Sequence, residues 1–213
     1  YLVRHGETHA NRRHIHQLPS SRLSSRGERQ AALLGEYFKD TYIDYLVSSD
    51  LTRAVETASS IAQATNVPLV QSAAYRELRR PKVLWGRSHF SPRTIHYGLS
   101  LLVHADDSGW HYKDGESLTE VRERAREVLK KLSGLQSEYE NVVVVSHALF
   151  LELLISFMCH REAPLLHEYL PILSPFSVPP NGSVTVLEYQ DTNETNVCKW
   201  HIRERNIIEH LQK

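Results

Sequence analysis

The feature that most limits the possible folds is a run of four consecutive valines between Asn141 and Ser146. An unbroken β-branched run indicates a strand that is buried on both faces, as in the parallel sheets of α/β proteins. It ends at His147 and is followed by an apolar helix predicted over Leu149 to Met158. A strand that needs cover on both faces predicts a sheet layered between helices.

The same alternation of strand and helix recurs along the chain. Apolar, β-prone runs predict further strands, and apolar residues at helical spacing predict helices after several of them. Asp50 is predicted to cap the helix that carries Arg53, and Ser117 with Glu120 has the pattern of a capping box. The fold class predicted is α/β: a three-layer α/β/α sandwich with a mostly parallel central sheet. The further strands are expected at 1–3, 45–49, 67–70, 183–189 and 197–203, the last two facing each other in a hairpin.

The stretch from Arg79 to Gly115 breaks this pattern and is rich in aromatic residues, histidine and glycine. We predict an insertion that covers the site and contains a short helix near Pro92 to His104. A chain of 213 residues fits one large domain with such an insertion. We therefore expect a single domain over 1–213, with a cap-like insertion at about 79–115.

Polar residues stand where three of the predicted strands end. Arg4 and His5 follow the first strand, Arg53 follows the second across a helix cap, and His147 follows the valine strand. In α/β sheets, ligands bind beyond the carboxyl ends of the strands. Because imidazole can act as a nucleophile and guanidinium binds phosphate oxygens in a bidentate way, this set predicts phosphoryl transfer to a histidine. A solvated Arg-His pair at a strand end is the alternative for the first segment alone.

The same residues suit a phosphate pocket. Phosphoryl transfer depends on positioning and on neutralising the charge of the phosphoryl oxygens. Arg4 and Arg53 fit that task, and His147 could add a third donor. The helix that begins at Ala148 would offer backbone N–H groups to an anion.

A leaving alkoxide also needs a proton donor, and Glu77 is the best candidate. It lies between a strand and the insertion, flanked by Tyr75 and Leu78. A partly desolvated carboxyl group near bound phosphate fits a general acid. The alternative is an exposed loop glutamate paired with Arg76 or Arg79.

Composition and missing motifs exclude several classes of function. The chain has 25 Lys+Arg and 25 Asp+Glu, so no nucleic-acid partner is expected. No Gly-rich phosphate loop, dinucleotide fingerprint or His-Glu-x-x-His motif occurs. A metal cluster of His9, His14 and His16 is not favoured because no carboxylate or cysteine stands at ligand spacing. We expect no metal and no cofactor.

Location is predicted from similar arguments. No apolar run reaches the roughly 18 residues of a membrane span, and no signal peptide precedes the first strand. The chain begins at Tyr1 without a methionine, so a few preceding residues are expected to be missing. Cys159 and Cys198 show no metal or disulfide spacing, and both are predicted to be reduced core residues. A cytoplasmic enzyme without a membrane partner is the expectation.

Several segments together resemble a known family. Arg4 to Thr8, followed by Asn11, resembles the Arg-His-Gly signature of the histidine phosphatase superfamily. More narrowly, the chain is similar to branch 1, which contains cofactor-dependent phosphoglycerate mutases and related phosphatases. The later matching segments, in chain order, are Gln17, Leu23-Ser24, Gly27, Gln30-Ala31, 48–54 with Thr57-Ala58, 115–117 and 145–147.

The resemblance implies a role for each matching residue. His5 would be the phosphorylated nucleophile and Glu77 the proton donor. No metal or nucleotide would be needed. The phosphate pocket would consist of Arg4, Arg53 and His147, and Asn11 and Gln17 would line the substrate side.

Departures from the family pattern favour a phosphatase. Leu18 follows Gln17 where the family often has glycine, and the segment after Glu77 differs from the usual mutase form. The chain is also shorter than typical cofactor-dependent mutases. We therefore predict a metal-independent histidine acid-type phosphatase acting on a small phosphorylated metabolite. The alternatives are a phosphoglycerate mutase-type transferase and a non-catalytic module that binds phosphorylated ligands.

The sequence leaves the substrate and the oligomeric state open. Basic residues in the insertion would either contact an anionic substrate or form a solvated surface. The Pro-rich loop from Pro164 to Gly182 is either a dimer surface or a lid. The basic residues of the insertion are Arg80, Lys82, Arg87 and Arg93.

Overall fold

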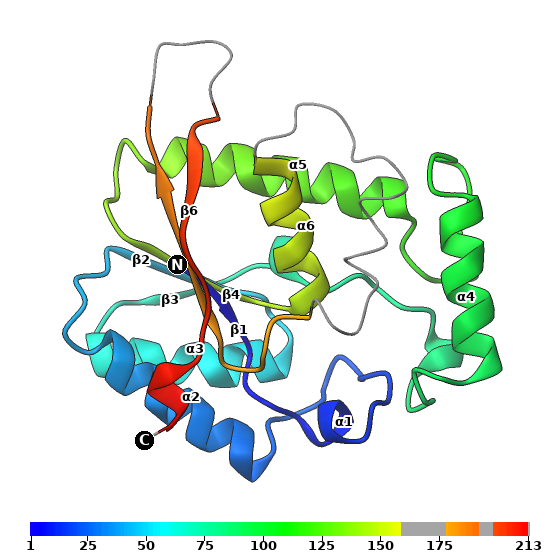
Figure 1. Cartoon of the computed structure of the whole chain (residues 1–213), viewed down its shortest axis with the longest axis horizontal. Helices are drawn as coiled ribbons and strands as arrows, with labels where there is room; N and C mark the ends of the chain where they lie inside the picture. Colours follow the sequence, from blue (N-terminus) through cyan, green and yellow to red (C-terminus); the bar gives the residue numbers. More distant parts are fainter. Residues whose placement is uncertain (159–177, 192–197, 213) are drawn as a thin grey trace.

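The computed structural model describes residues 1–158, 178–191 and 198–212 (Figure 1). Its centre is a six-stranded sheet in the order β3-β2-β4-β1-β5-β6. The first four strands in this order run parallel, β5 is antiparallel to β1, and β6 is antiparallel to β5. The predicted mostly parallel sheet and its final hairpin are therefore confirmed. The strands are β1 (Leu2–Arg4), β2 (Tyr45–Ser48), β3 (Leu69–Gln71), β4 (Val142–Ser146), β5 (Val184–Tyr189) and β6 (Trp200–Ile207).

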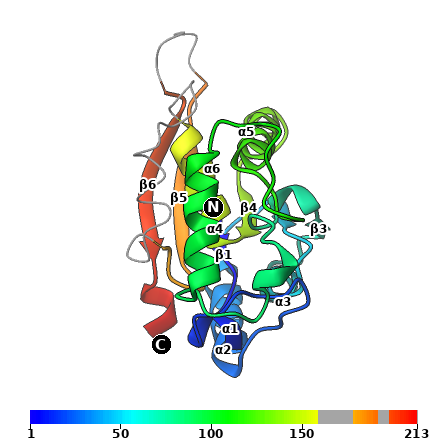
Figure 2. The same cartoon turned by 90° about the vertical axis from the view of Figure 1, so that its right-hand side faces the viewer.

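Helices cover both faces of this sheet. Figure 1 shows α2 and α3 together on one side and α5 and α6 on the other, and Figure 2 shows the layers from the side. The short α1 follows β1, and α4 lies at the edge of the molecule beyond α5 and α6. The helices are α1 (His9–Arg12), α2 (Ser25–Phe38), α3 (Thr52–Thr65), α4 (Pro92–Val103), α5 (Leu118–Leu135) and α6 (Ala148–Met158).

The valine run lies in the middle of the sheet, as predicted. Strand β4 pairs with β1 on one side and with β2 on the other. Val143 and Val145 belong to the core beneath α2 and α3, whereas Val144 belongs to the core beneath α5 and α6. Successive side chains of a strand point to opposite faces, so one short segment contributes to both cores. This confirms the three-layer α/β/α fold.

Local predictions are met in part. The capping box of Ser117 and Glu120 is present at the start of α5, and α4 occupies the predicted place within the insertion. Asp50, however, does not cap α3: the N-cap residue is Leu51, without a side-chain hydrogen bond. The carboxylate of Asp50 instead accepts two hydrogen bonds from the guanidinium of Arg76, at 2.5 and 2.6 Å. This pairing takes up both carboxylate oxygens and turns the side chain toward the segment of Arg76.

The prediction for the cysteines is wrong at one of the two positions. Cys198 is disulfide-bonded. Cys159 and most of the Pro-rich loop lie outside the described residues. No described helix is long and apolar enough to span a membrane.

Candidate active site

Two histidines meet where the central strands end. Strand β1 runs into His5 and β4 runs into His147, and the register of the two strands pairs Arg4 with Ser146. The imidazole rings of His5 and His147 lie with their centroids 5.1 Å apart. Both histidines are buried. Residues separated by more than 140 positions in the chain are thus brought together at the carboxyl edge of the sheet, as the sequence predicted.

The ring of His5 is held in one orientation. Its Nδ1 lies 2.7 Å from the carbonyl oxygen of Gly6. Because a carbonyl only accepts hydrogen bonds, Nδ1 carries the proton and Nε2 keeps its lone pair. The Nε of Arg53 donates to this Nε2 over 3.3 Å. Burial, then the charges of Arg53 and Arg4, hold the pKa of His5 well below its usual value. His5 is therefore a neutral imidazole with an available nitrogen.

Two guanidinium groups lie near this imidazole, that of the buried Arg53 and that of the half-buried Arg4. Burial lowers the pKa of Arg4 and of Arg53 to about 10, so both stay charged at neutral pH. Arg4 donates to the carbonyl of Pro179, and Arg53 donates to the carbonyl of Leu18 over 3.4 Å. Neither makes an ion pair with a carboxylate of the described residues, and the nearby charge of Glu77 raises the pKa of both. Buried cations that lack a paired anion favour the binding of one.

His147 is the second histidine beside the His5 ring. It is fully buried, and its Nε2 lies 2.8 Å from the hydroxyl of Ser49 at the end of β2. Its Nδ1 has no described hydrogen-bond partner. Burial, followed by the charge of Arg53, holds the pKa of His147 well below its usual value. If the Ser49 hydroxyl donates to Nε2, the proton of the neutral ring lies on Nδ1, where it is available to a ligand.

Glu77 is placed by the first turn of α6. Its carboxylate accepts hydrogen bonds from the backbone N–H groups of Leu149 and Phe150, at 3.2 and 3.1 Å, and from that of Leu78 at 3.1 Å. Glu77 is half-buried and makes no ion pair within the part of the chain that the structure describes. The alternative of an exposed glutamate paired with Arg76 or Arg79 is therefore wrong.

The prediction for the start of α6 needs a correction. The helix does begin at Ala148 and does present N–H groups to an anion. The anion that receives the N–H groups of Leu149 and Phe150 is the carboxylate of Glu77, a part of the protein itself. The N-terminal end of a helix favours negative charge of either origin. Ala148 is buried beside His147, and binding of a ligand at Ala148 stays a prediction.

Asn11 and Gln17 both lie against Thr8. The Asn11 side-chain oxygen accepts from the backbone N–H and the hydroxyl of Thr8, at 3.1 and 2.9 Å, in the capping box of α1. The Gln17 side-chain oxygen lies 3.2 Å from the same hydroxyl. Each amide thus uses its oxygen to hold the loop after β1, which leaves the NH2 group as the end that could face a substrate.

Sequence reasoning missed two contacts of this loop. Asn181 donates to the carbonyl of His5 over 3.0 Å and so fixes the backbone behind the imidazole. Gly6 lies so close to Gly27 of α2 that a Cβ on Gly6 would stand 2.6 Å from the Gly27 carbonyl oxygen. The turn signal of Pro180, Asn181 and Gly182 was visible in the sequence, but nothing in it indicated a contact with His5.

The segment 79–115, predicted to be an insertion, packs against the loop that carries Gln17. His16 is buried, its backbone N–H donates to the carbonyl of Arg87, and its ring lies 4.5 Å from that of His89. Of the four basic residues expected either to contact an anionic substrate or to form a solvated surface, Arg80 is half-buried and the other three are exposed. Among residues 1–158, 178–191 and 198–212, no group of three His, Cys, Asp or Glu side chains is arranged to hold a metal.

These features define a class. An α/β sheet whose carboxyl edge presents a neutral buried imidazole beside two guanidinium groups is the arrangement of a phosphoryl-transfer enzyme. Comparison with known families agrees, because the model of the histidine phosphatase superfamily (branch 1) matches residues 1–202. The chain belongs to this superfamily.

Relatives within the family include proteins named as mutases. A protein of Salmonella arizonae named "Probable phosphoglycerate mutase GpmB" is 36% identical over 158 residues, which cover 73% of this chain and 72% of the relative. A protein of the same name from Erwinia tasmaniensis is 32% identical over 157 residues, with the same coverage.

A similar solved structure is that of a phosphatase. The mycobacterial glucosyl-3-phosphoglycerate phosphatase, solved in complex with VO3, has a TM-score of 0.76 and 24% sequence identity. The match covers 96% of this chain and 97% of that chain. At this level of identity the likeness shows that the two chains share a fold.

Proposed function

We propose that the chain is a phosphomonoester phosphatase that acts through a phosphohistidine intermediate on a small phosphorylated metabolite. The observation that carries the proposal is the state of His5. Its Nδ1 is committed to the Gly6 carbonyl, its Nε2 lies 3.3 Å from the Nε of Arg53, and its pKa is held well below the usual value. A neutral imidazole with a fixed, unprotonated nitrogen beside cations is suited to attack phosphorus.

In the first step, the Nε2 lone pair of His5 forms a bond to phosphorus while the bond from phosphorus to the ester oxygen breaks. Arg4, Arg53 and the Nδ1–H of His147 neutralise the phosphoryl oxygens. Glu77 gives its proton to the leaving oxygen, so that an alcohol departs in place of an alkoxide. Asn11 and Gln17 line the side on which the alcohol is bound, and the backbone N–H at Ala148 donates to a phosphoryl oxygen.

In the second step, the Glu77 carboxylate takes a proton from water as the water oxygen attacks phosphorus. The bond between phosphorus and Nε2 breaks, which releases phosphate and restores the neutral imidazole. No metal ion is required, so we expect full activity in the presence of EDTA.

A phosphoglycerate mutase-type transferase is the second candidate, and the relatives named as probable mutases favour it. The two candidates share the first step and differ in what receives the phosphoryl group. A phosphatase passes it to water, whereas a mutase returns it to a sugar-acid hydroxyl. A non-catalytic module would form no covalent intermediate at all.

The test is phosphate release from a panel of sugar phosphates, phosphoglycerates, nucleotides and phosphopeptides, with wild type beside His5→Ala. Turnover of related esters that is lost in His5→Ala supports the phosphatase. A phosphohistidine adduct without net phosphate release indicates the mutase. The absence of both leaves a binding module, and full activity of His5→Ala overturns the proposal.

We extend the proposal to the organisation of the chain. Residues 1–213 act as one domain, in which the insertion at about 79–115 selects the substrate. The half-buried Arg80 is the best placed of its basic residues for that task. A cytoplasmic location stays a prediction, and the disulfide of Cys198 gives it no support because disulfides are rare in the reducing cytosol.

A further inference from the structure

The segment that carries Glu77 has little regular structure of its own. It follows the 3-10 turn Ala73–Tyr75, and the backbone of Arg76 is extended. A general acid must be held within hydrogen-bond reach of the leaving oxygen. The groups that fix this segment therefore bear directly on the proton transfer.

Arg124 of α5 holds the segment on the side before Glu77. Its Nη1 donates to the carbonyls of Ala74 and Arg76, at 3.0 and 2.7 Å. Its Nε and Nη2 donate to the two carboxylate oxygens of Glu116, each at 2.9 Å. Such a bidentate ion pair fixes both side chains in one geometry.

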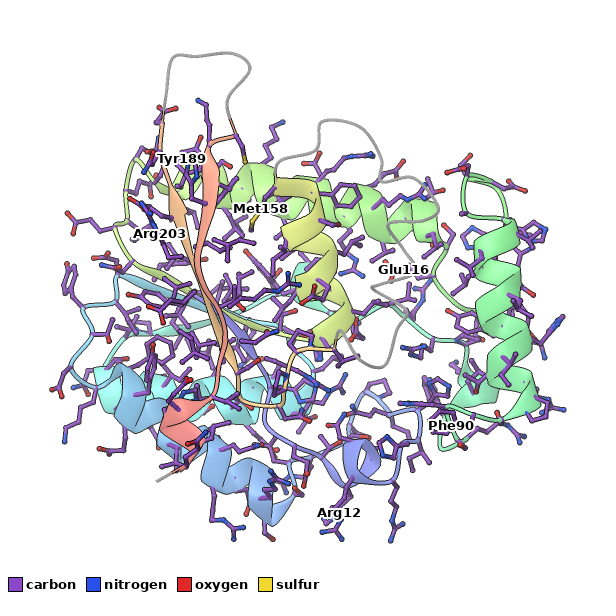
Figure 3. All side chains as sticks on the ribbon, viewed as in Figure 1. Arg12, Phe90, Glu116, Met158, Tyr189 and Arg203 are labelled. Atoms are coloured by element: carbon purple, nitrogen blue, oxygen red, sulfur yellow. The ribbon has the colours of Figure 1, made fainter. Side chains whose placement is uncertain are left out.

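Glu116 holds the segment on the side after Glu77. Its carboxylate accepts a hydrogen bond from the backbone N–H of Arg79 at 2.9 Å, and its own N–H donates to the Arg79 carbonyl at 2.8 Å. Figure 3 labels Glu116, which lies just before α5. The side chains of Glu116 and Arg124 are only 11% and 19% exposed, so solvent screens the pair weakly.

The same guanidinium also contacts the residue that binds the Glu77 carboxylate. Arg124 lies over the ring of Phe150, 4.5 Å from its centroid. The backbone N–H of Phe150 donates to Glu77 at 3.1 Å. Arg124 therefore contacts both the backbone segment that carries Glu77 and the first turn of α6, whose N–H groups bind the Glu77 carboxylate.

We propose that the Glu116–Arg124 pair is a positioning device that holds the Glu77 carboxyl group at the leaving-group side of the pocket. Neither residue touches the substrate. The inference rests on the proposed function, because it gives these residues a task only if Glu77 is the proton donor. Lysine cannot replace Arg124, since it lacks the planar fork that reaches Glu116 and two carbonyls together.

The test compares leaving groups. An ester of an alkyl alcohol needs a proton on the departing oxygen, whereas p-nitrophenolate departs without one. We expect Arg124→Met to lower kcat/KM for an alkyl phosphate about 10- to 100-fold and for p-nitrophenyl phosphate less than about threefold. Arg124→Lys should not restore the loss. Glu116→Gln, which keeps the shape of the side chain, should show the same pattern with a smaller loss and serves if Arg124→Met does not fold.

The matched control is Arg126→Met. Arg126 is exposed on the same helix and lies 5.1 Å from the ring centroid of Phe157, and it makes no hydrogen bond to the described residues of the Glu77 segment. We expect Arg126→Met to leave kcat/KM unchanged for both the alkyl ester and p-nitrophenyl phosphate. An equal loss for alkyl and aryl esters in Arg124→Met, or no loss for either, would overturn the inference.

Glu77→Gln separates this inference from the function on which it rests. It should lower kcat/KM, which reports the first step, for alkyl esters selectively, and Arg124→Met added to Glu77→Gln should cause no further loss of kcat/KM. If Glu77→Gln shows no leaving-group selectivity, the assignment of the proton donor fails. If Glu77→Gln is selective but Arg124→Met adds its own loss to it, the positioning role alone fails.

Discussion

Two pairs of histidines in this molecule look alike at first and differ in what surrounds them. His5 and His147 lie 5.1 Å apart at the carboxyl edge of the sheet, and His16 and His89 lie 4.5 Å apart where the insertion meets the loop after β1. In the first pair both rings are buried, whereas in the second His16 is buried and His89 is exposed. Proximity of two imidazoles therefore does not by itself mark a catalytic site.

The difference lies in orientation and in charge. His5 has one nitrogen fixed by a carbonyl and the other facing the guanidinium of Arg53. His16 has its Nε2 3.0 Å from the Thr94 hydroxyl and its Nδ1 without a described partner. Beside the first pair lie the buried Arg53, the half-buried Arg4 and the charge of Glu77, whereas the cation near the second pair is the half-buried Arg80. A reactive site thus requires strand ends that bring several such groups together.

The largest expected effect on kcat/KM is the contrast between a substitution in the first histidine pair and one in the second. His5→Ala should lower kcat/KM at least about 1000-fold, because it removes the nucleophile. His89→Ala, at an exposed position of the other pair, should change it less than about fivefold. Steady-state phosphate release checks both variants, and an equally severe loss in His89→Ala would contradict a catalytic role for the first pair alone.

A second comparison concerns the cations beside each pair. Arg53→Met removes a buried charge from the phosphate pocket and should lower kcat/KM about 100-fold on every ester. Arg80→Met should instead raise KM for esters that carry a second anionic group and leave kcat nearly unchanged. The ratio of kcat/KM between singly and doubly anionic esters measures the contrast. An unchanged ratio in Arg80→Met would speak against selection by the insertion.

A smaller effect on kcat/KM is expected at Asn181, which contacts the backbone of His5. Asn181→Ala removes the 3.0 Å hydrogen bond to the His5 carbonyl. Loss of one such bond corresponds to about 1 kcal/mol, or about fivefold in kcat/KM. Kinetics of Asn181→Ala beside Asn181→Asp would show whether the amide donor is what matters. Wild-type activity in both variants would mean that other contacts fix this backbone.

The smallest effect on activity, and a clear one on stability, is expected at His16. Burial, with the charges of Arg80 and His89, lowers its pKa to about 3. Between about pH 6.5 and pH 3, His16 is protonated in the unfolded chain but stays neutral in the folded protein. The contribution of His16 therefore makes the free energy of unfolding fall as the pH falls over this range.

This slope can be measured for His16 alone. We expect His16→Asn to make the decline shallower by up to about 1.4 kcal/mol per pH unit between pH 6 and 4. Urea unfolding of both proteins across this range is the measurement. Parallel slopes would show that His16 titrates normally in the folded state.

The sequence predicted those parts of the molecule that depend on local pattern. The valine run, the strand endings at Arg4, His5 and His147, and the capping box of Ser117 follow from residue type and spacing within a few positions. The carboxyl ends of parallel strands meet at one edge by construction, so the convergence of the site could also be foreseen.

The remaining contacts depend on chain segments whose meeting has no local signal. Asp50 matched the pattern of a helix cap, but Arg76, brought close by the fold, takes its carboxylate. Asn181 reaches the His5 backbone across 176 positions, and Glu77 finds its donors in a helix 72 positions later. Partners of this kind are set by tertiary packing and appear only in the structure.

The most direct test of the central claim is the identification of the phosphorylated atom. Wild-type protein is mixed with substrate, quenched within milliseconds, digested, and analysed by 31P NMR and mass spectrometry. The structure predicts one acid-labile phosphoryl group per chain, bonded to Nε2 of His5, and none in His5→Ala. Phosphate release that proceeds with no phosphoryl group on His5, or with one on Nδ1, would contradict the account.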